Sequence, residues 1–153
     1  MSVRQVVYVA EGWGIGELVY EDELLAWHEL PRARPGEANG SDRLVERIVA
    51  YFDGAQDSFT DVELDLDGCT EFERSALVAM RRIPYGETAT YGDVAALAGH
   101  VNAQRAVGTV CARNRFGLVV PCHRVVASDG IGSYGSLGVG YKRRLLELEG
   151  VSV

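Results

Sequence analysis

A cysteine, a histidine and an arginine follow one another at positions 122 to 124, between two short runs of β-branched residues. Only the thiolate form of a cysteine is a strong nucleophile, and a free cysteine is only about 3% ionised at neutral pH. A neighbouring base increases that fraction, and His123 is the nearest candidate. The segment therefore predicts an activated nucleophilic thiol at Cys122. For an isolated Cys-His pair the alternative is a buried structural cysteine beside an incidental histidine.

The residues around this thiol indicate how it is held. The valines on both sides, at 119–120 and 125–126, predict buried strand, and Pro121 is expected to bend the chain out of the ladder. Adjacent side chains on an extended strand point to opposite faces. His123 can therefore reach Cys122 only where the backbone turns or where a water molecule lies between them, and we expect the water.

The segment Pro121–Val125 resembles the active-site signature of the O6-alkylguanine-DNA alkyltransferases, also called methylated-DNA–protein-cysteine methyltransferases. The resemblance covers roughly residues 71 to 150, because other stretches match at corresponding separations: 84–95 (PYGETATYGDVA), 105–108 (RAVG), Asn114 and 145–150 (LLELEG). It implies a DNA-repair enzyme that works in a single turnover. The alkyl group of O6-alkylguanine, or of O4-alkylthymine, in duplex DNA would pass irreversibly to Cys122 after base flipping.

The resemblance also implies roles for individual residues. Glu149 orients His123, which takes the thiol proton through water, and Tyr91 donates to N3 of the leaving guanine. Arg105 enters the base stack and fills the gap left by the extruded nucleotide. The full sets are Cys122, His123, Glu149 and Tyr91 for catalysis; Thr90, Tyr91, Gln104, Arg105, Ala106 and Gly108 for DNA contacts; and Asn114, Val125, Tyr134, Gly135 and Ser136 for the substrate pocket.

Three of these roles have a plainer alternative. Tyr91 could be a core aromatic, Arg105 a phosphate contact or a solvated charge, and Glu149 an exposed carboxylate at a helix end. A carboxylate beside the negative end of a helix dipole is slightly unfavourable, which favours a specific partner for Glu149.

The chain departs from the family at two places. The family's tyrosine-x-glycine-glycine becomes residues 134–137 (YGSL), so the backbone amide that faces O6 belongs either to Gly135 or to Ser136. Arg115 stands where the family usually has proline, so a looser turn is expected there.

The charge distribution is compatible with DNA on one half of the chain only. The net charge of −7 argues at first against a nucleic-acid partner. Residues 1–69, however, hold 5 basic against 15 acidic side chains, whereas residues 70–153 hold 10 against 7. The half with the signature is therefore the basic one, as a DNA-facing surface requires.

Cysteine use and hydropathy set further expectations. The chain has three cysteines, an odd number that cannot form a complete set of disulfides, and no CxxC pair. This cysteine use favours a reducing compartment. No signal peptide is visible, and no apolar run approaches the ~18 residues of a membrane span. The cysteines and histidines are not spaced like a zinc site, although some family members carry structural zinc. We expect a cytoplasmic protein, nucleoid-associated if prokaryotic, that uses no cofactor or metal, has no membrane or protein partner and acts as a monomer.

The fold class predicted for the chain is α/β (α+β), in two domains. Residues 1–67 are expected to form a small antiparallel sheet with a helix, which is a ribonuclease H-like arrangement. Residues 68–153 are expected to form a mainly helical domain with a helix-turn-helix, winged-helix-like in kind. The resemblance implies that this second domain binds DNA and accepts the alkyl group.

Patterns along the chain predict the individual elements. Strands are expected between Val3 and Leu30, with His28 at the surface or on an edge strand. Thr70-x-x-Glu73 and Thr90-x-x-Asp93 are typical helix starts. The remaining expectations are a helix capped by Ser41 and ended by Gly54, a strand over 62–66, a helix capped by Asn102 and running to about 113, and a last helix from about 139 with Lys142, Arg143 and Arg144 on its polar side.

The helix expected after Asn102 carries few side chains that could distinguish bases. Gln104 and Arg105 are long and polar, whereas Ala103, Ala106, Gly108 and Ala112 are small. A helix that reads the major groove normally offers several long polar side chains to base edges. Small residues instead let a helix approach closely without sequence preference, which agrees with the family's use of the minor groove.

Two other classes of function are compatible with parts of the pattern. A non-catalytic damage-recognition module on the same scaffold would normally lack Cys122. A thiol hydrolase would use a Cys-His pair, but such pairs usually come from distant chain positions. A permanent mass gain on the thiol, no change, or catalytic turnover would distinguish the three classes.

Overall fold

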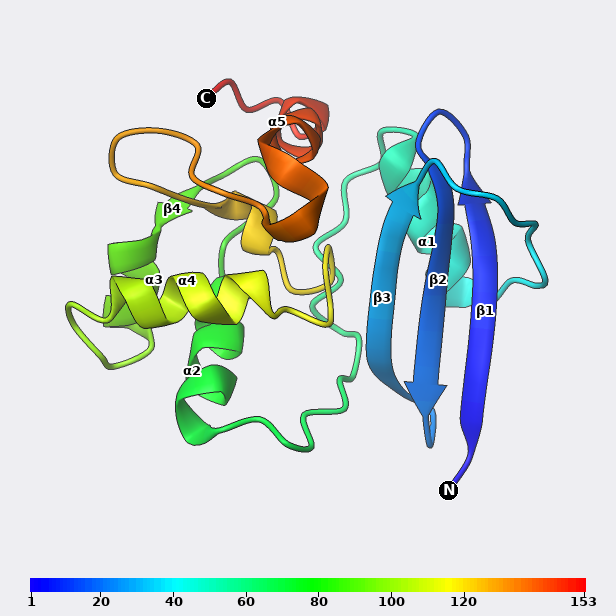
Figure 1. The fold of residues 1–153 in the computed structure, drawn as a ribbon, viewed down its shortest axis with the longest axis horizontal. Coiled ribbons are helices and arrows are strands. Elements are labelled where there is room, and N and C mark those ends of the chain that lie inside the picture. Colours follow the sequence, from blue (N-terminus) through cyan, green and yellow to red (C-terminus); the bar gives the residue numbers. More distant parts are fainter.

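The computed structural model describes residues 1–153, and its first element is a three-stranded antiparallel sheet (Figure 1). The strands are β1 (Val3–Ala10), β2 (Gly14–Glu21) and β3 (Leu24–Arg32), in the order β1-β2-β3. The turn between β2 and β3 holds Asp22 and Glu23 at φ 50° and 66°, the left-handed conformation that a tight hairpin requires. The expected sheet is confirmed.

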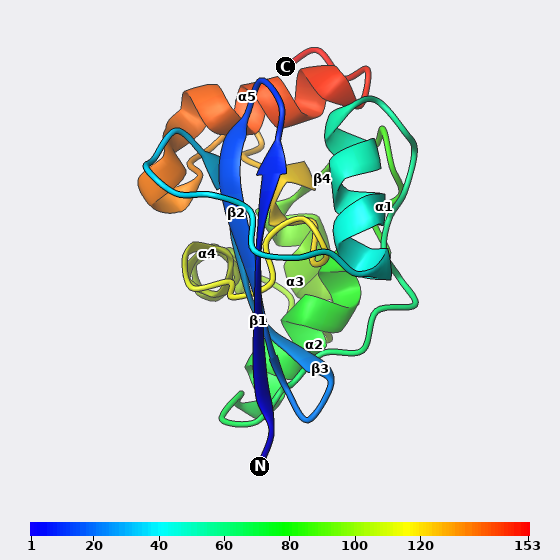
Figure 2. The ribbon, with the colours of Figure 1, turned by 90° about the vertical axis from the view of Figure 1, so that its right-hand side faces the viewer.

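Helix α1 (Arg43–Phe52) packs one apolar face into the core beside the sheet (Figure 2). Its buried residues recur at helical spacing and are Leu44, Val45, Ile48, Tyr51 and Phe52. The cap is Asp42, whose carboxylate accepts a hydrogen bond from the backbone N–H of Val45, so the expected cap at Ser41 was wrong by one residue. An ionised carboxylate also interacts favourably with the positive end of the helix dipole.

The rest of the chain is mainly helical. Its elements are α2 (Glu71–Met80), β4 (Ala89–Thr90), α3 (Tyr91–Leu97), α4 (Gln104–Ala112), the 3-10 turn η1 (Cys122–Arg124), β5 (Val125–Val126), the 3-10 turn η2 (Gly135–Leu137) and α5 (Gly138–Leu148). Thr70 caps α2, and Thr90 with Asp93 forms a complete capping box at the start of α3. The strands β4 and β5 pair in parallel over two residues. The mixed α/β class is therefore confirmed.

Three expected elements differ in the structure. Residues 62–66 form no strand, because only Leu64 bridges to Leu25 before the acidic segment moves away from the sheet. Helix α4 has Ala103 rather than Asn102 as its cap, since Asn102 has φ 69° and does not adopt the extended conformation of a cap. Residues 119–120 lie in a buried turn instead of a strand.

Strand β3 is not a free edge, because later segments of the chain, around Glu63 and Arg115, cover it. The backbone N–H of Leu25 donates to the Glu63 carbonyl, and that of His28 donates to the Arg115 carbonyl. His28 lies on β3, an edge strand of the sheet as expected, but it is only 4% exposed and so does not lie at the surface. One apolar core extends from the sheet through α1 and α2 to α5.

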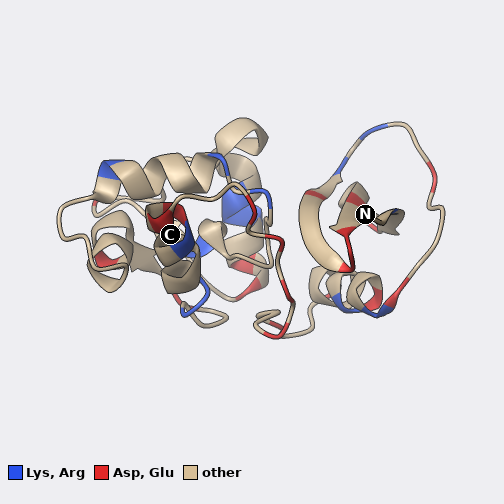
Figure 3. Ribbon diagram, turned by 90° about the horizontal axis from the view of Figure 1, so that it is seen from below, with Lys and Arg blue, Asp and Glu red and all other residues tan.

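The charge asymmetry is visible on the ribbon (Figure 3). Acidic residues gather along the connection between α1 and α2, whereas ten of the fifteen basic residues lie within residues 70–153. None of the helices has the length and apolar character needed to span a bilayer.

Candidate active site

Cys122 opens the short 3-10 turn η1 and is 6% exposed. Pro121, which has no N–H to give to a strand ladder, accepts a hydrogen bond from Arg124 N at 2.9 Å through its carbonyl. The backbone therefore turns at the cysteine, as expected after Pro121, and the strand expected at 125–126 is present, whereas the one expected at 119–120 is not. Two residues of parallel strand, Val125 and Val126, follow directly and fix the far end of the turn.

Asn114 holds the thiol from the end of α4. Its side-chain amide donates to Cys122 Sγ at 3.2 Å and to the Val120 carbonyl at 3.0 Å, and its Oδ1 accepts from Phe116 N at 2.9 Å. Burial raises the pKa of Cys122, and the hydrogen bond from Asn114 opposes that rise. The amide thus favours the thiolate, as the charge of Lys142 also does, in a site whose burial disfavours charge.

Behind the thiol, the carboxylate of Glu149 is fully enclosed and accepts hydrogen bonds on both oxygens. Oε2 accepts from His123 Nε2 at 2.7 Å and from Tyr51 Oη at 2.5 Å. Oε1 accepts from Arg124 Nε at 2.9 Å and from Gly86 N at 3.0 Å. The structure therefore brings the predicted pair His123 and Glu149 together, and it adds three partners around them.

The protonation of this pair follows from its surroundings. Burial alone would raise the pKa of Glu149, but the hydrogen bonds from His123 and Arg124 outweigh it and hold that pKa well below its usual range. Burial lowers the pKa of His123, and Glu149 offsets this only in part. A carboxylate can only accept, so a neutral His123 carries its proton on Nε2. Nδ1, which is buried and has no hydrogen-bond partner, is then the free basic nitrogen.

Lys142 is another buried group at the site. Its ammonium donates to the carbonyls of Val125 at 2.5 Å and Ser133 at 3.1 Å, and no part of its side chain is exposed. The expectation that Lys142 lies on the polar side of α5 was wrong. The spacing of Lys142, Leu145, Leu146 and Glu149 places them all on one helix face, and that face is buried.

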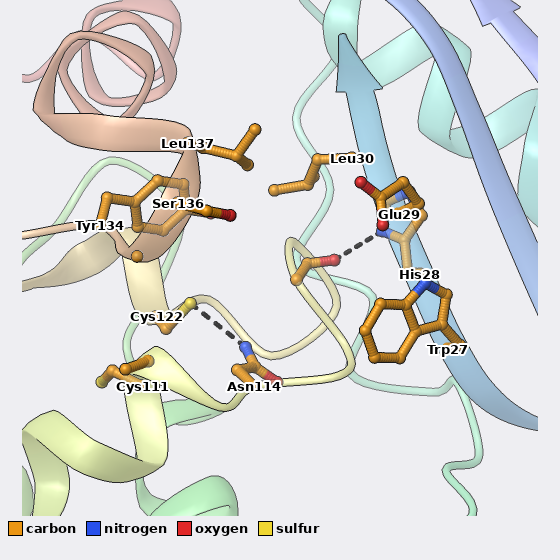
Figure 4. A pocket seen from close by; sticks show the side chains of 13 residues that line it. Trp27, His28, Glu29, Leu30, Cys111, Asn114, Cys122, Tyr134, Ser136 and Leu137 are labelled. Carbon is orange, nitrogen blue, oxygen red and sulfur yellow. Dashed lines mark hydrogen bonds between the residues drawn. The ribbon is translucent and has the colours of Figure 1, made fainter.

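A cavity of about 180 Å³ begins at the thiol and extends to β3 (Figure 4). Figure 4 shows Cys122 and Asn114 on one side of it and Trp27 and Leu30 on the other. The loop residues of the predicted pocket close it from above: Tyr134, Gly135 and Ser136, together with Leu137. The Tyr134 hydroxyl is buried without a hydrogen-bond partner, and its ring stacks on Tyr141 at 6.3 Å. Val125, also predicted for the pocket, does not line the cavity.

An open groove of about 520 Å³ contains most of the predicted DNA-binding residues. Tyr91, Gln104, Arg105 and Gly108 line it together with Thr109, Ala112, Gly132 and Ser133. Ala112 also lines the cavity at Cys122, so groove and cavity share a wall.

The other two predicted DNA contacts lie outside this lining. Ala106 is exposed on α4, and Thr90 caps α3. At the rim of the groove, a Cβ on Gly132 would stand 3.0 Å from the Tyr91 hydroxyl, so a glycine is needed for this close approach.

Tyr51, Arg124, Lys142 and His28 contact the site without having been predicted for it. Tyr51 recurs on the apolar face of α1, and Lys142 on the apolar face of α5, so helical periodicity could have placed both in the core. Arg124 belongs to the signature itself. Nothing in the local sequence pairs His28 with Gly117, 89 residues later. The described residues contain no group of three His, Cys, Asp or Glu placed to hold a metal ion.

Comparison with known proteins agrees with this geometry. The family model for the DNA-binding domain of 6-O-methylguanine DNA methyltransferase matches residues 71–151. The methylated-DNA–protein-cysteine methyltransferase of Mycolicibacterium paratuberculosis is 44% identical over 131 residues, which are 85% of this chain and 73% of that protein. The protein of the same name from Methanothermobacter thermautotrophicus is also 44% identical over 111 residues, 72% of this chain but only 62% of that protein.

Solved structures share the whole architecture. A crystal structure of Mycobacterium tuberculosis OGT in complex with DNA superimposes with a TM-score of 0.79 and 32% identity, covering 95% of this chain and 92% of that chain. The O6-methylguanine-DNA methyltransferase of the archaeon Pyrococcus kodakaraensis has the same fold, with a TM-score of 0.69 at 24% identity, over 98% of this chain and 100% of that chain. The chain therefore belongs to the 6-O-methylguanine DNA methyltransferase family.

Proposed function

We propose that this protein repairs O6-alkylguanine, and also O4-alkylthymine, in duplex DNA by moving the alkyl group irreversibly to its own Cys122. One observation carries the proposal. A buried thiol stands at the end of a cavity beside a groove with an exposed arginine, and the pair His123 and Glu149 lies behind it. The names of the relatives, methylated-DNA–protein-cysteine methyltransferases, support the same activity.

Recognition would use the groove along α3 and α4. The O6 atom of a paired guanine lies within the stack, where a thiolate on a protein turn cannot reach it in line, so the base must leave the duplex. Arg105 is exposed near the start of α4, where it can replace the extruded base, and Tyr91 lines the same groove. The small side chains of Ala106 and Gly108 allow the helix to approach the minor groove without preference for sequence.

The chemical step would begin with His123. Its free Nδ1 takes the thiol proton, through one water molecule, while Glu149 stabilises the ring that becomes charged. The thiolate then forms a bond to the alkyl carbon, and the bond from that carbon to O6 breaks with its electron pair on the guanine. Tyr91 donates a proton to N3, and the proton now on His123 returns to the tyrosine through solvent. The product is a thioether, which has no good leaving group, so each molecule acts once.

Backbone groups would orient the flipped base. The carbonyls of Cys122 and Val125 would receive the exocyclic amine of guanine, each through its second lone pair, since Val125 N and Lys142 Nζ already occupy the first. The amide of Gly135 or of Ser136 would face O6. We also propose a domain boundary at residues 67–68, action as a monomer and a place in the cytoplasm with the chromosomal DNA.

A single-turnover assay tests this function. Wild-type protein incubated with a duplex containing one O6-methylguanine should restore guanine in an amount equal to the protein added, and no more. Cys122→Ser should bind the duplex and restore none. Cys111→Ser, which alters the other thiol of the same cavity, should keep transfer at the wild-type stoichiometry. Repeated turnover, or repair by Cys122→Ser, would contradict the proposal.

A further inference from the structure

His28 lies in the middle of β3 and is buried, yet it belongs to neither the predicted catalytic set nor the groove. Its backbone N–H donates to the Arg115 carbonyl at 2.8 Å. Its ring makes two further short contacts, from Nδ1 to the Gly117 carbonyl at 2.6 Å and from Nε2 to the Tyr8 hydroxyl at 2.6 Å. All three hydrogen-bonding groups that His28 can direct toward the interior are therefore occupied.

The partners of the ring fix its tautomer. A carbonyl oxygen only accepts, so Nδ1 must carry the proton that goes to Gly117, and Nε2 then accepts from Tyr8. Burial lowers the pKa of His28 to about 4, so the ring is neutral at pH 7 and this tautomer persists. The Tyr8 ring is itself held against the backbone of β2, because a Cβ at Gly16 would come within 2.3 Å of it.

The two carbonyls that His28 holds flank Phe116, within the turn that follows α4. Asn114 starts that turn, and its amide is the group that donates to Cys122 Sγ at 3.2 Å. The turn also carries two internal hydrogen bonds, from Phe116 N to Asn114 Oδ1 and from Val120 N to the Phe116 carbonyl. A displacement of Gly117 would thus reach the thiol through a short and rigid path.

We propose that His28 is a positioning residue for the nucleophile: the N-terminal sheet, through His28, sets the turn that aims the Asn114 amide at Cys122. Functional groups of this kind must be held within roughly 0.5 Å of their productive place to act. Arg115 stands in this turn where the family usually has proline, so part of the rigidity must come from contacts outside the turn. The inference rests on the proposed function only in taking Cys122 as the acceptor.

The test measures thiol reactivity directly, without DNA. Wild-type and variant proteins are treated with iodoacetamide between pH 6 and pH 10, and alkylation is followed on the peptide that contains Cys122. His28→Leu removes both ring contacts, and a weaker hydrogen bond to the thiolate should raise the apparent pKa of Cys122, with a roughly tenfold lower rate at pH 7. The titratable groups around the thiol, on α3, α4, η1, the pocket loop and α5, stay unchanged: Tyr91, Cys111, His123, Tyr134 and Lys142.

Two further variants separate positioning from general stability. His28→Asn places an amide N–H where Nδ1 was, so it should restore the bond to Gly117 and bring the pH profile back toward wild type although the Tyr8 contact is lost. His100→Leu, at an exposed histidine that packs on Phe72, is the matched control and should leave the profile of Cys122 unchanged.

The outcomes are distinct. A folded His28→Leu protein with the wild-type pH profile of Cys122 alkylation would overturn the inference. An equal rise in the apparent pKa of Cys122 in His28→Leu and His28→Asn would overturn it as well. Should His28→Leu fail to fold, Tyr8→Phe frees Nε2 and allows the other tautomer, so it should raise the pKa of Cys122 by a smaller amount, and an unchanged profile would count against the inference. If the variants raise the pKa of Cys122 but the wild-type protein transfers no alkyl group from DNA, the proposed function is refuted and the positioning role of His28 stands.

Discussion

The imidazole of His123 donates from Nε2 to the Glu149 carboxylate at 2.7 Å, and its Nδ1 is buried without a hydrogen-bond partner. The carboxylate accepts five hydrogen bonds from four residues, so it stays ionised and keeps the proton of the ring on Nε2. Nδ1 is therefore the ring nitrogen that can take a proton, and the proposed function requires it to receive the proton of Cys122.

Glu149→Gln should slow alkyl transfer about a hundredfold, because an amide neither fixes the tautomer of His123 nor stabilises its charged form. The same change leaves the buried Arg124 without its counter-charge, which should lower the free energy of unfolding by about 3 kcal/mol. Single-turnover rates and urea unfolding measure both effects. Glu147→Gln, at an exposed carboxylate of the same helix, is the control. A wild-type transfer rate in folded Glu149→Gln would contradict this role.

Acid should destabilise the protein partly through His28. Its pKa is 6.5 in the unfolded chain and about 4 in the folded one, so the unfolded state binds more protons between these values. The stability that His28 contributes is complete above pH 6.5 and is lost as the pH falls toward 4, by about 3 kcal/mol in all. Glu149, whose folded pKa is lowered, adds a further loss in the same direction below its unfolded pKa of about 4.3.

Urea unfolding of wild type and His28→Asn at several pH values isolates this contribution. The asparagine does not titrate, so the difference between their free energies of unfolding should shrink as the pH falls from 7 to 4. A difference that stays constant over this range would show that His28 does not titrate as its burial requires.

Much of the candidate site could be predicted from short segments, because several of its residues are close together in the sequence. Cys122 and His123 adjoin one another, and the helix that carries Arg105 starts near its expected place. The pairing of His123 with Glu149 over 26 residues needed the family resemblance.

What could not be predicted depends on contacts between distant parts of the chain. His28 is buried because the carbonyl of Gly117, 89 residues later, accepts its hydrogen, and nothing near His28 in the sequence indicates that partner. The strand expected over 62–66 failed for a similar reason, since an alternating pattern does not show whether a partner strand lies alongside.

Arg105→Ala should reduce repair of duplex DNA far more than reaction with free O6-benzylguanine. The side chain is exposed in the groove and does not line the cavity, so it can assist extrusion of the base without touching the thiol. Rates on both substrates are compared with those of Arg113→Ala, at an exposed arginine at the other end of α4. Equal losses of Arg105→Ala on the two substrates would argue against a role in flipping.

The cavity beyond the thiol should admit large alkyl groups. Its volume is about 180 Å³, and a cavity of roughly 150 Å³ is enough for benzene. Leu30 lies against Gly117 at its far wall, where a Cβ on the glycine would come within 3.1 Å of the leucine. Leu30→Phe should therefore lower the ratio of benzyl to methyl transfer rates roughly tenfold. Leu24→Phe, on the same strand but outside the cavity, should keep the wild-type ratio of benzyl to methyl transfer rates. Equal ratios in the two variants would contradict the prediction.

The most direct test is to weigh the peptides of the protein after reaction with a duplex that carries O6-methylguanine. Cys111 and Cys122 line the same cavity, so the Cys111 peptide is an internal control for nonspecific methylation of thiols at this site. We expect the Cys122 peptide to carry one methyl group in place of a proton, in an amount equal to the lesion lost, and the Cys111 peptide to be unmodified. A lesion that disappears while the Cys122 peptide keeps its original mass would contradict this expectation.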